Sequence, residues 1–159
     1  CGKCRSLCVF FRSLTEAAAI QSRMAEFPEL LDTITAILLN EGSRKTESAT
    51  KAVMFLAKLA RSPASASRIV SKSFDKVVSA MKDIINAAGS DPRKWVGNSA
   101  EDWANIFFMN ISQHESAKYL LRAHGIVELL APLLQIDHYE SLIAAATISY
   151  LCGADAKGE

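Results

Sequence analysis

The sequence predicts an all-α fold in which helical units stack side by side as an α-solenoid. Three stretches share one hydrophobic pattern, with key positions at Leu59, Ile111 and Leu151. Alanine precedes each key position by seven residues, and a large apolar residue precedes each by three. The key positions lie 52 and 40 residues apart, close to the period of stacked helical repeats. Because one such unit cannot bury its apolar face alone, units stack and leave an extended binding surface.

The composition excludes several classes of protein. The 159 residues suffice for one domain with a substantial core. Half of them are apolar, but no run approaches the roughly 18 uninterrupted apolar residues of a membrane span. Lys and Arg (18) nearly balance Asp and Glu (17), for a net charge of +1, which argues against a nucleic-acid partner. We therefore expect neither a membrane nor a nucleic acid as the partner.

The first complete unit, residues 16–61, follows part of a preceding unit at residues 1–15. Pro28 is expected to open the medium helix, because a missing amide proton costs nothing in a first turn. Gly42 lies just past the end of that helix, where glycine is favoured. Apolar residues at helical spacing define the medium and the long helix. Helices are expected at residues 4–15, Glu16–Glu26, Pro28 to just before Gly42, and about Lys45–Arg61.

The second and third units, residues 62–114 and 115–153, repeat this order of short, medium and long helix. A Ser-Pro pair breaks the chain before the second unit, and a loop of about ten residues at 89–98 precedes its long helix. Ser99, with Asp102 three residues on, fits a helix N-cap pattern. Helices are expected at Ala64–Ser71, Phe74–Ala88, Ser99 to about His114, Glu115–His124, Ile126–Gln135 after a break at Gly125, and Tyr139–Cys152.

The segment MNISQHESAKYLLRAHGIVELLAPLLQ, residues 109–135, resembles the armadillo repeat. In that family a helix end similar to Asn-Ile-Ser precedes a short helix, a glycine and an apolar second helix. The third unit matches best; the first two lack this glycine and have Phe27-Pro28 and Ser73-Phe74 there. The resemblance implies a right-handed α-solenoid of about three three-helix repeats plus part of a preceding one. We expect residues 1–159 to form a single domain, as a fragment of a longer solenoid.

In armadillo-like proteins the long helices of successive repeats line up and form a concave groove. Carried over position by position, this arrangement assigns a ladder of side chains to the groove. They include aromatic rings with a polar handle, an amide and two cations, which suit the anchors of an interface. We predict that the groove binds an extended peptide or a helix of another protein. The partner-binding groove residues are Lys51, Met54, Lys58, Trp103, Ile106, Asn110, Tyr139 and Tyr150.

Two of these residues have alternative interpretations as core residues. A Trp at helical spacing is often part of the core, so Trp103 fits the core and the groove equally well. The Asn110 amide would need partners in the core, so we expect it to be exposed in the groove. Importin-type armadillo proteins bind basic peptides through paired Trp and Asn, but Ile106 fills the Trp position here. Because Lys51 and Lys58 would repel a basic peptide, an acidic or mixed-charge ligand fits better.

Three of the four cysteines stand near the start, at Cys1, Cys4 and Cys8. A zinc site needs about four ligands, and Cys152 and the histidines are remote in sequence. A redox CxxC normally opens a helix after a strand, and no strand is predicted there. With Phe11, the spacing of three, four and three fits one buried helix stripe, which is the preferred interpretation. We therefore expect no metal and no cofactor.

No arrangement of residues predicts catalysis. His114, His124 and His138 stand at or near helix ends, where histidine more often interacts with the last carbonyls than with a substrate. The sequence contains neither a glycine loop for phosphate nor a local Cys/His or Ser/His pair. We therefore predict that the protein is not an enzyme.

The preferred function is a non-enzymatic scaffold or adaptor for protein–protein interaction in the cytoplasm, with the nucleus as a further location. One alternative is a chaperone-like adaptor, because DWANIFFMNIS, residues 102–112, resembles armadillo proteins that assist the folding of translation elongation factor 2. A second alternative is the cysteine-dependent zinc or redox protein. Both terminal helices lack the polar caps that end a solenoid, so we expect flanking repeats or end-to-end self-association.

Overall fold

The computed structural model describes residues 27–41, 46–89 and 97–153, and within these ranges the chain is all-α. The expected helices at 4–15 and 16–26 lie outside the described residues. No described helix has the length and apolar character needed to cross a membrane. The elements are α3 (Pro28–Glu41), α4 (Glu47–Leu59), α5 (Pro63–Lys72), α6 (Phe74–Ala88), α7 (Ala100–Ile111), α8 (Glu115–Ala123), α9 (Ile126–Leu130), the 3-10 helix η3 (Ala131–Gln135) and α10 (Tyr139–Cys152).

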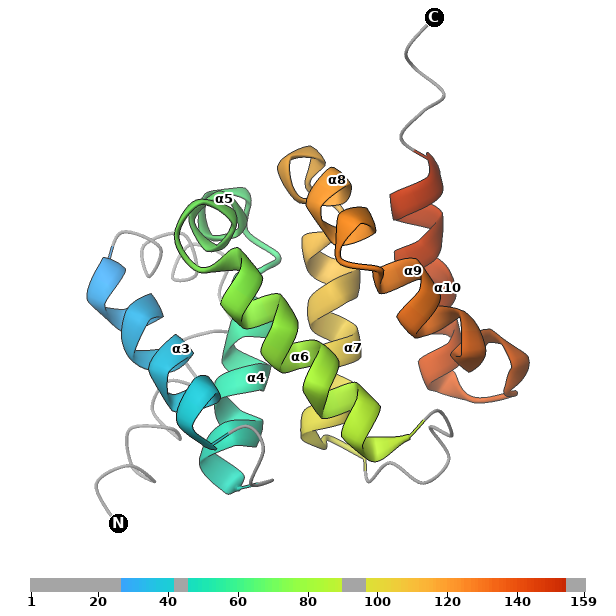
Figure 1. Cartoon of the computed structure of the whole chain (residues 1–159), viewed down its shortest axis with the longest axis horizontal. Helices are drawn as coiled ribbons and strands as arrows, with labels where there is room; N and C mark the ends of the chain where they lie inside the picture. The colour runs from blue at the N-terminus through green and yellow to red at the C-terminus, as the bar shows by residue number, and fades with distance from the viewer. Residues whose placement is uncertain (1–26, 42–45, 90–96, 154–159) are drawn as a thin grey trace, which may run out of the picture.

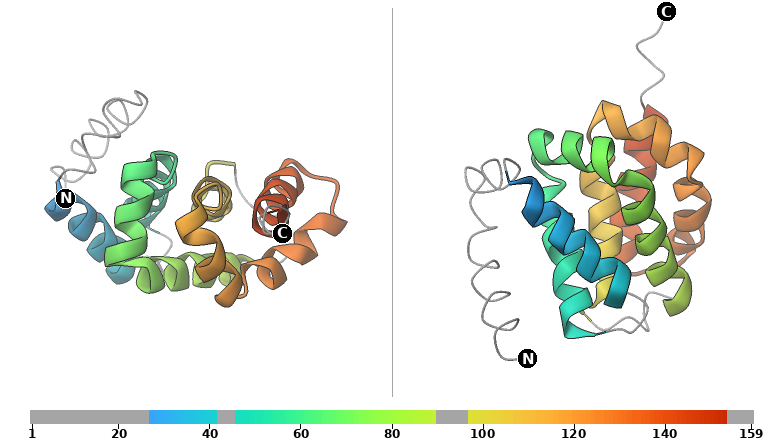
Figure 2. Two further views of the ribbon diagram at one scale, coloured as in Figure 1. Left: turned by 90° about the horizontal axis from the view of Figure 1, so that it is seen from above. Right: turned by 60° about the vertical axis from the view of Figure 1, so that its left-hand side comes forward.

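The three long helices α4, α7 and α10 lie side by side in one layer (Figure 1). The other layer contains α3 and α6, with α9 and η3 further along it, as Figure 2 shows from above. The short helices α5 and α8 contact each other across one end of these layers. Helix α7 occupies the middle, where it contacts α4, α6 and α10. The long helices therefore form a continuous row.

The hydrophobic pattern that repeats in the sequence marks the core between the layers. Its key positions Leu59, Ile111 and Leu151 are all buried. The alanines seven residues earlier are buried too, and their small side chains allow neighbouring helices to approach closely. In the middle of the row, Phe107 and Phe108 are fully buried and pack edge to face, with ring centroids 5.6 Å apart. The key positions and the alanines of the repeated pattern therefore lie in the core.

Polar side chains fix where two of the long helices begin. The Thr46 hydroxyl accepts a hydrogen bond from the Ala49 amide at the start of α4. At the start of α7, the Ser99 hydroxyl accepts from the Asp102 amide, and the Asp102 carboxylate accepts from the Ser99 amide. This reciprocal pair satisfies two amides that have no partner within the helix. The N-cap predicted at Ser99 is confirmed.

The third unit differs from its prediction in one helix. The segment Ile126–Gln135 was expected to form a single helix, but α9 ends at Leu130 and continues as the 3-10 helix η3. Pro132 supplies the physical reason, because it has no amide proton and its ring clashes with the preceding turn. The break expected at Gly125 is present, and this glycine adopts a left-handed conformation with φ of 70°.

Candidate interaction face

Five of the six groove residues predicted on α4 and α7 are half-buried, and we call the surface to which they are assigned the α4–α7 face. It consists of Lys51, Met54 and Lys58 of α4 and Trp103 and Ile106 of α7. All five side chains are half-buried. They are neither sealed in the core nor fully in water, so they can contact a partner without rearrangement of the two helices.

The helical period of α4 places its three face residues together. Residues 51, 54 and 58 are spaced by three and four, so they share one side of the helix. The buried residues of α4, which include Val53, Leu56 and Leu59, take the remaining positions. On the exposed edge of the face, Lys51 Nζ lies 3.0 Å from Glu47 Oε1, one turn earlier. This ion pair directs the Lys51 side chain along the helix and partly neutralises its charge.

Lys58 and Trp103 join the two helices across the face. The Lys58 Nζ lies 5.9 Å from the centroid of the Trp103 ring. At this distance the ammonium is attracted to the electron-rich ring face, by about 0.5–1 kcal/mol at an exposed site. Among the described residues, Lys58 has no carboxylate partner. Trp103 packs partly against the core, so it belongs to both the core and the face.

Asn110 does not belong to this face, and the expectation that its amide is exposed is wrong. The residue is only 5% exposed, and its Nδ2 donates to the Ala57 carbonyl of α4 over 2.8 Å. The last turn of α4 tightens, so the Arg61 amide donates to the Lys58 carbonyl instead of to that of Ala57. A carbonyl left without its intrahelical donor needs another one, and Asn110 provides it. The preceding residue of α7, Met109, is half-buried.

His114 makes a second contact of the same kind. Its Nε2 lies 2.8 Å from the Ala60 carbonyl, just past the end of α4. The prediction that histidines here interact with terminal carbonyls is therefore confirmed for His114. The other two histidines contact different groups. His124 Nε2 lies 3.0 Å from Asp75 Oδ1, and His138 Nδ1 accepts a hydrogen bond from the Glu140 amide at the start of α10.

The predicted groove residues of α10 lie on the same layer but are far more exposed. Tyr139 stands at the first residue of α10 and is 65% exposed, and Tyr150 in its last turns is also exposed. Both tyrosine side chains are exposed, whereas Trp103 packs partly against the core. The structure brings Lys58 and Trp103 together, leaves Lys51, Met54 and Ile106 half-buried on the same two helices, and places the two tyrosines at opposite ends of the next helix.

A buried polar cluster lies between α7 and α10, and no spacing in the sequence indicates it. Asn105 Nδ2 donates to the Glu140 carbonyl and to Glu140 Oε2, over 3.0 and 3.1 Å. Burial raises the pKa of the Glu140 carboxyl, the nearby Asp102 charge raises it further, and the Asn105 hydrogen bond and the His138 charge lower it. Burial likewise raises the pKa of Asp102. The signal was faint, because Asn105 and Glu140 stand 35 residues apart.

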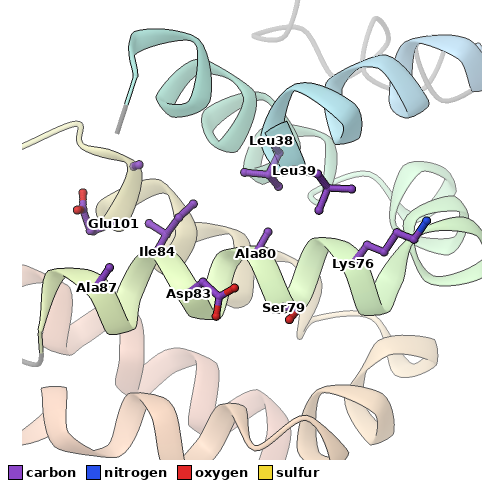
Figure 3. Close-up of a pocket in the computed structure, with 10 residues that line it drawn as sticks. Leu38, Leu39, Lys76, Ser79, Ala80, Asp83, Ile84, Ala87 and Glu101 are labelled. Carbon is purple, nitrogen blue, oxygen red and sulfur yellow. The ribbon is translucent and has the colours of Figure 1, made fainter. Parts of the chain in front are cut away.

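A cavity of about 610 Å³ lies between α3 and α6, beside the first turn of α7 (Figure 3). Leu38 and Leu39 of α3 face the small side chain of Ala80 across it, while Lys76 and Glu101 stand toward its two ends. The cavity is mainly apolar, so it suits a hydrophobic side chain or small molecule rather than a reaction between charged groups.

Among the described residues, no three His, Cys, Asp or Glu side chains gather as metal ligands. Cys1, Cys4 and Cys8, for which zinc and redox chemistry were considered, lie outside the described residues. The described cysteine, Cys152, is exposed at the end of α10. No family model, curated protein or solved structure matches this chain. The function is therefore inferred from the chemistry of these surfaces.

Proposed function

We propose that the protein is a non-enzymatic scaffold, built as an armadillo-like α-solenoid, that binds an acidic segment of another protein along the α4–α7 face. The side-by-side order of α4, α7 and α10 supports this architecture, because successive long helices form the binding surface of such a solenoid. The proposal places the protein in the cytoplasm as an adaptor.

One observation carries the choice of an acidic ligand. Lys58 is a half-buried cation that is held over the Trp103 ring and has no carboxylate partner among the described residues. A carboxylate of the ligand can pair with Lys58 without first breaking an ion pair. Beside it, Met54 and Ile106 offer an apolar contact that excludes water and strengthens that pair. Lys51, two turns earlier on α4, supplies a second ammonium, which a ligand carboxylate would share with Glu47.

The test is selection of peptides from a random surface-display library. The parent chain is expected to enrich acidic sequences that contain an aromatic or aliphatic residue. Reversing both charges with Lys51→Glu and Lys58→Glu should weaken binding of the selected peptides by roughly tenfold or more, since each lost pair becomes a repulsion. Raising the salt concentration should weaken binding to the parent in the same direction.

The control reverses two exposed lysines elsewhere, Lys72→Glu on α5 and Lys76→Glu on α6, and so makes the same change in net charge. This variant should bind the selected peptides as the parent does. Enrichment of basic peptides, enrichment of none, or equal loss in both variants would contradict the proposal. Circular dichroism of each variant establishes that a loss of binding does not come from unfolding.

A further inference from the structure

The buried polar cluster between α7 and α10 consists of Asp102 and Asn105 of α7 and Glu140 of α10, and we call it the acidic cluster. Asp102 is 7%, Asn105 0% and Glu140 6% exposed. Asp102 and Asn105 stand one helical turn apart, so they share one side of α7. Asn105 Nδ2 lies 3.1 Å from Glu140 Oε2, and the Asp102 charge acts on the Glu140 carboxyl. The cluster therefore brings two carboxylates and one amide from two helices together, out of contact with water.

The acidic cluster carries an excess of buried negative charge. Within the described ranges, neither Asp102 nor Glu140 forms an ion pair with a Lys or Arg. Burial raises the pKa of both carboxyls, and the exposed His138, whose charge lowers both, does not reverse this. Buried charges in proteins are normally paired or coordinate a metal ion. Two adjacent buried carboxylates without a Lys or Arg are therefore suited to a bound cation.

The side-chain oxygen of Asn105 points independently to a ligand. Oδ1 is buried and accepts no hydrogen bond from any described residue. It is bonded to the same carbon as Nδ2, which donates to Glu140 Oε2, so it lies beside that carboxylate. A buried polar atom without a partner is costly and rare in folded proteins. A cation bound to Oδ1 satisfies this oxygen and neutralises the two carboxylates at the same time.

We propose that the acidic cluster binds a calcium ion through side-chain oxygens of Asp102, Asn105 and Glu140. Carboxylate and amide oxygens are the ligands that Ca²⁺ prefers, and it accepts the irregular geometry that two helices provide. Mg²⁺ demands a nearly ideal octahedron and keeps several waters, which suits a buried cluster poorly. The site uses two carboxylates and an amide, so it needs no third acidic, His or Cys ligand. With so few charged ligands, its dissociation constant should be about 10⁻⁴–10⁻³ M.

The first test is urea unfolding in EDTA, in CaCl₂ and in MgCl₂, with NaCl added to equalise the ionic strength. Calcium well above the expected dissociation constant should raise the urea midpoint of the parent, because a ligand of the native state stabilises it. Magnesium should raise it less. Glu140→Gln keeps the shape of the side chain but removes one charged ligand, so calcium binding should weaken by roughly tenfold or more. Glu128→Gln, at an exposed site on α9, is the matched control and should respond as the parent does.

The second test converts the amide ligand into a third carboxylate. Asn105→Asp should be far less stable than the parent in EDTA, because a further buried charge is added without a partner. Calcium should restore its helical circular dichroism, and should bind the restored protein more tightly than the parent, since affinity rises with the number of charged ligands. Calorimetric titration with CaCl₂ measures both dissociation constants. A structural role of Asn105 alone predicts the loss of stability but no rescue by calcium.

Three outcomes would overturn the proposal. A parent midpoint that CaCl₂ raises no more than NaCl would mean that a proton, not a metal ion, compensates the cluster. An equal rise in the parent and in Glu140→Gln would place the bound calcium elsewhere. An Asn105→Asp variant that calcium does not restore would remove Asn105 from the ligands. An equal response to MgCl₂ and CaCl₂ would overturn the choice of calcium. Peptide binding at the α4–α7 face is measured separately, so either proposal can fail without the other.

Discussion

Asn110 links α4 to α7 through a single hydrogen bond to a backbone carbonyl. Asn110→Ala should lower the free energy of unfolding by about 1–3 kcal/mol, because the buried Ala57 carbonyl loses its donor. Urea denaturation measures the change. Asn86→Ala, at an exposed position of α6, makes the same substitution and should stay within about 0.5 kcal/mol of the parent. Equal effects at the two sites would mean that the hydrogen bond contributes nothing to stability.

Glu140 is expected to make stability depend on pH. Since burial and Asp102 raise its native pKa, the native state binds the proton more tightly than the unfolded state. Its contribution to stability is therefore greatest in acid and falls as the pH rises through the raised pKa. Glu140→Gln removes this charge, and its new amide can donate to Asn105 Oδ1, which has no partner among the described residues. At about pH 7 the variant should be more stable by on the order of 1 kcal/mol.

The pH dependence of the stability difference between Glu140→Gln and the parent tests this expectation. Urea unfolding at about pH 7 and about pH 4 should show the advantage of Glu140→Gln shrinking in acid, where the parent carboxyl is protonated as well. Glu128→Gln, at an exposed site on α9, should show no such trend. A Glu140→Gln variant that is less stable than the parent at neutral pH would contradict the expectation.

Single residues were predictable where the helical period alone decides their place. The spacing of Lys51, Met54 and Lys58 places them on one side of α4, and all three are half-buried; their role in binding a partner stays a prediction. Asn110 was not predictable, because its burial depends on a tightened turn in another helix. The partnership of Asn105 with Glu140 likewise depends on how α7 and α10 dock, which no local pattern specifies.

At the scale of an element, Gly125 makes the sharp turn between α8 and α9 possible. Its φ of 70° is left-handed, a conformation that costs a residue with a Cβ roughly 1–2 kcal/mol. Gly125→Ala should therefore lower the free energy of unfolding by about that amount, measured by urea denaturation. The matched control is Gly97→Ala, where an added Cβ meets nothing within 4 Å, and a change of less than about 0.5 kcal/mol is expected.

Most elements were predictable from their ends. Helices α6 and α10 begin and end at the residues expected, since prolines, glycines and N-cap residues define such boundaries locally. The long helices α4 and α7 are shorter than expected, because their last residues form tighter turns that the hydrophobic period does not reveal. The sequence contains Pro132 in η3, but the apolar residues around it fit a continuous helix, so the change to a 3-10 helix was not predicted.

At the scale of the whole molecule, α7 should be the most stable part. It contacts α4, α6 and α10, and it contains the fully buried Phe107 and Phe108. Amide hydrogen exchange should therefore be slowest in α7 and faster in α10, whose outer side is exposed. Exchange followed by mass spectrometry measures this order. Faster exchange in α7 than in α10 for the dilute protein would contradict it.

The all-α class and the core were predictable because one periodic pattern specifies both. The repeated columns fall inside the molecule, and Ile148 alone among their large apolar members is only half-buried. The helical order of short, medium and long elements follows from the same pattern. How the units curve, and which surface a partner uses, depends on small angles between helices that a hydrophobic pattern does not encode.

The position of Trp103 has a practical consequence, because the fluorescence of its indole ring depends on what surrounds the α4–α7 face. The ring is half-buried, and a positive charge stands 5.9 Å from its centre. The emission wavelength of an indole depends on the charges and the water around it. A ligand that draws Lys58 away from the Trp103 ring is therefore expected to shift this wavelength. The other tryptophan, Trp95, can be replaced by phenylalanine to leave one emitter. The fluorescence of Trp103 can therefore test for a ligand on the proposed α4–α7 face without any attached dye.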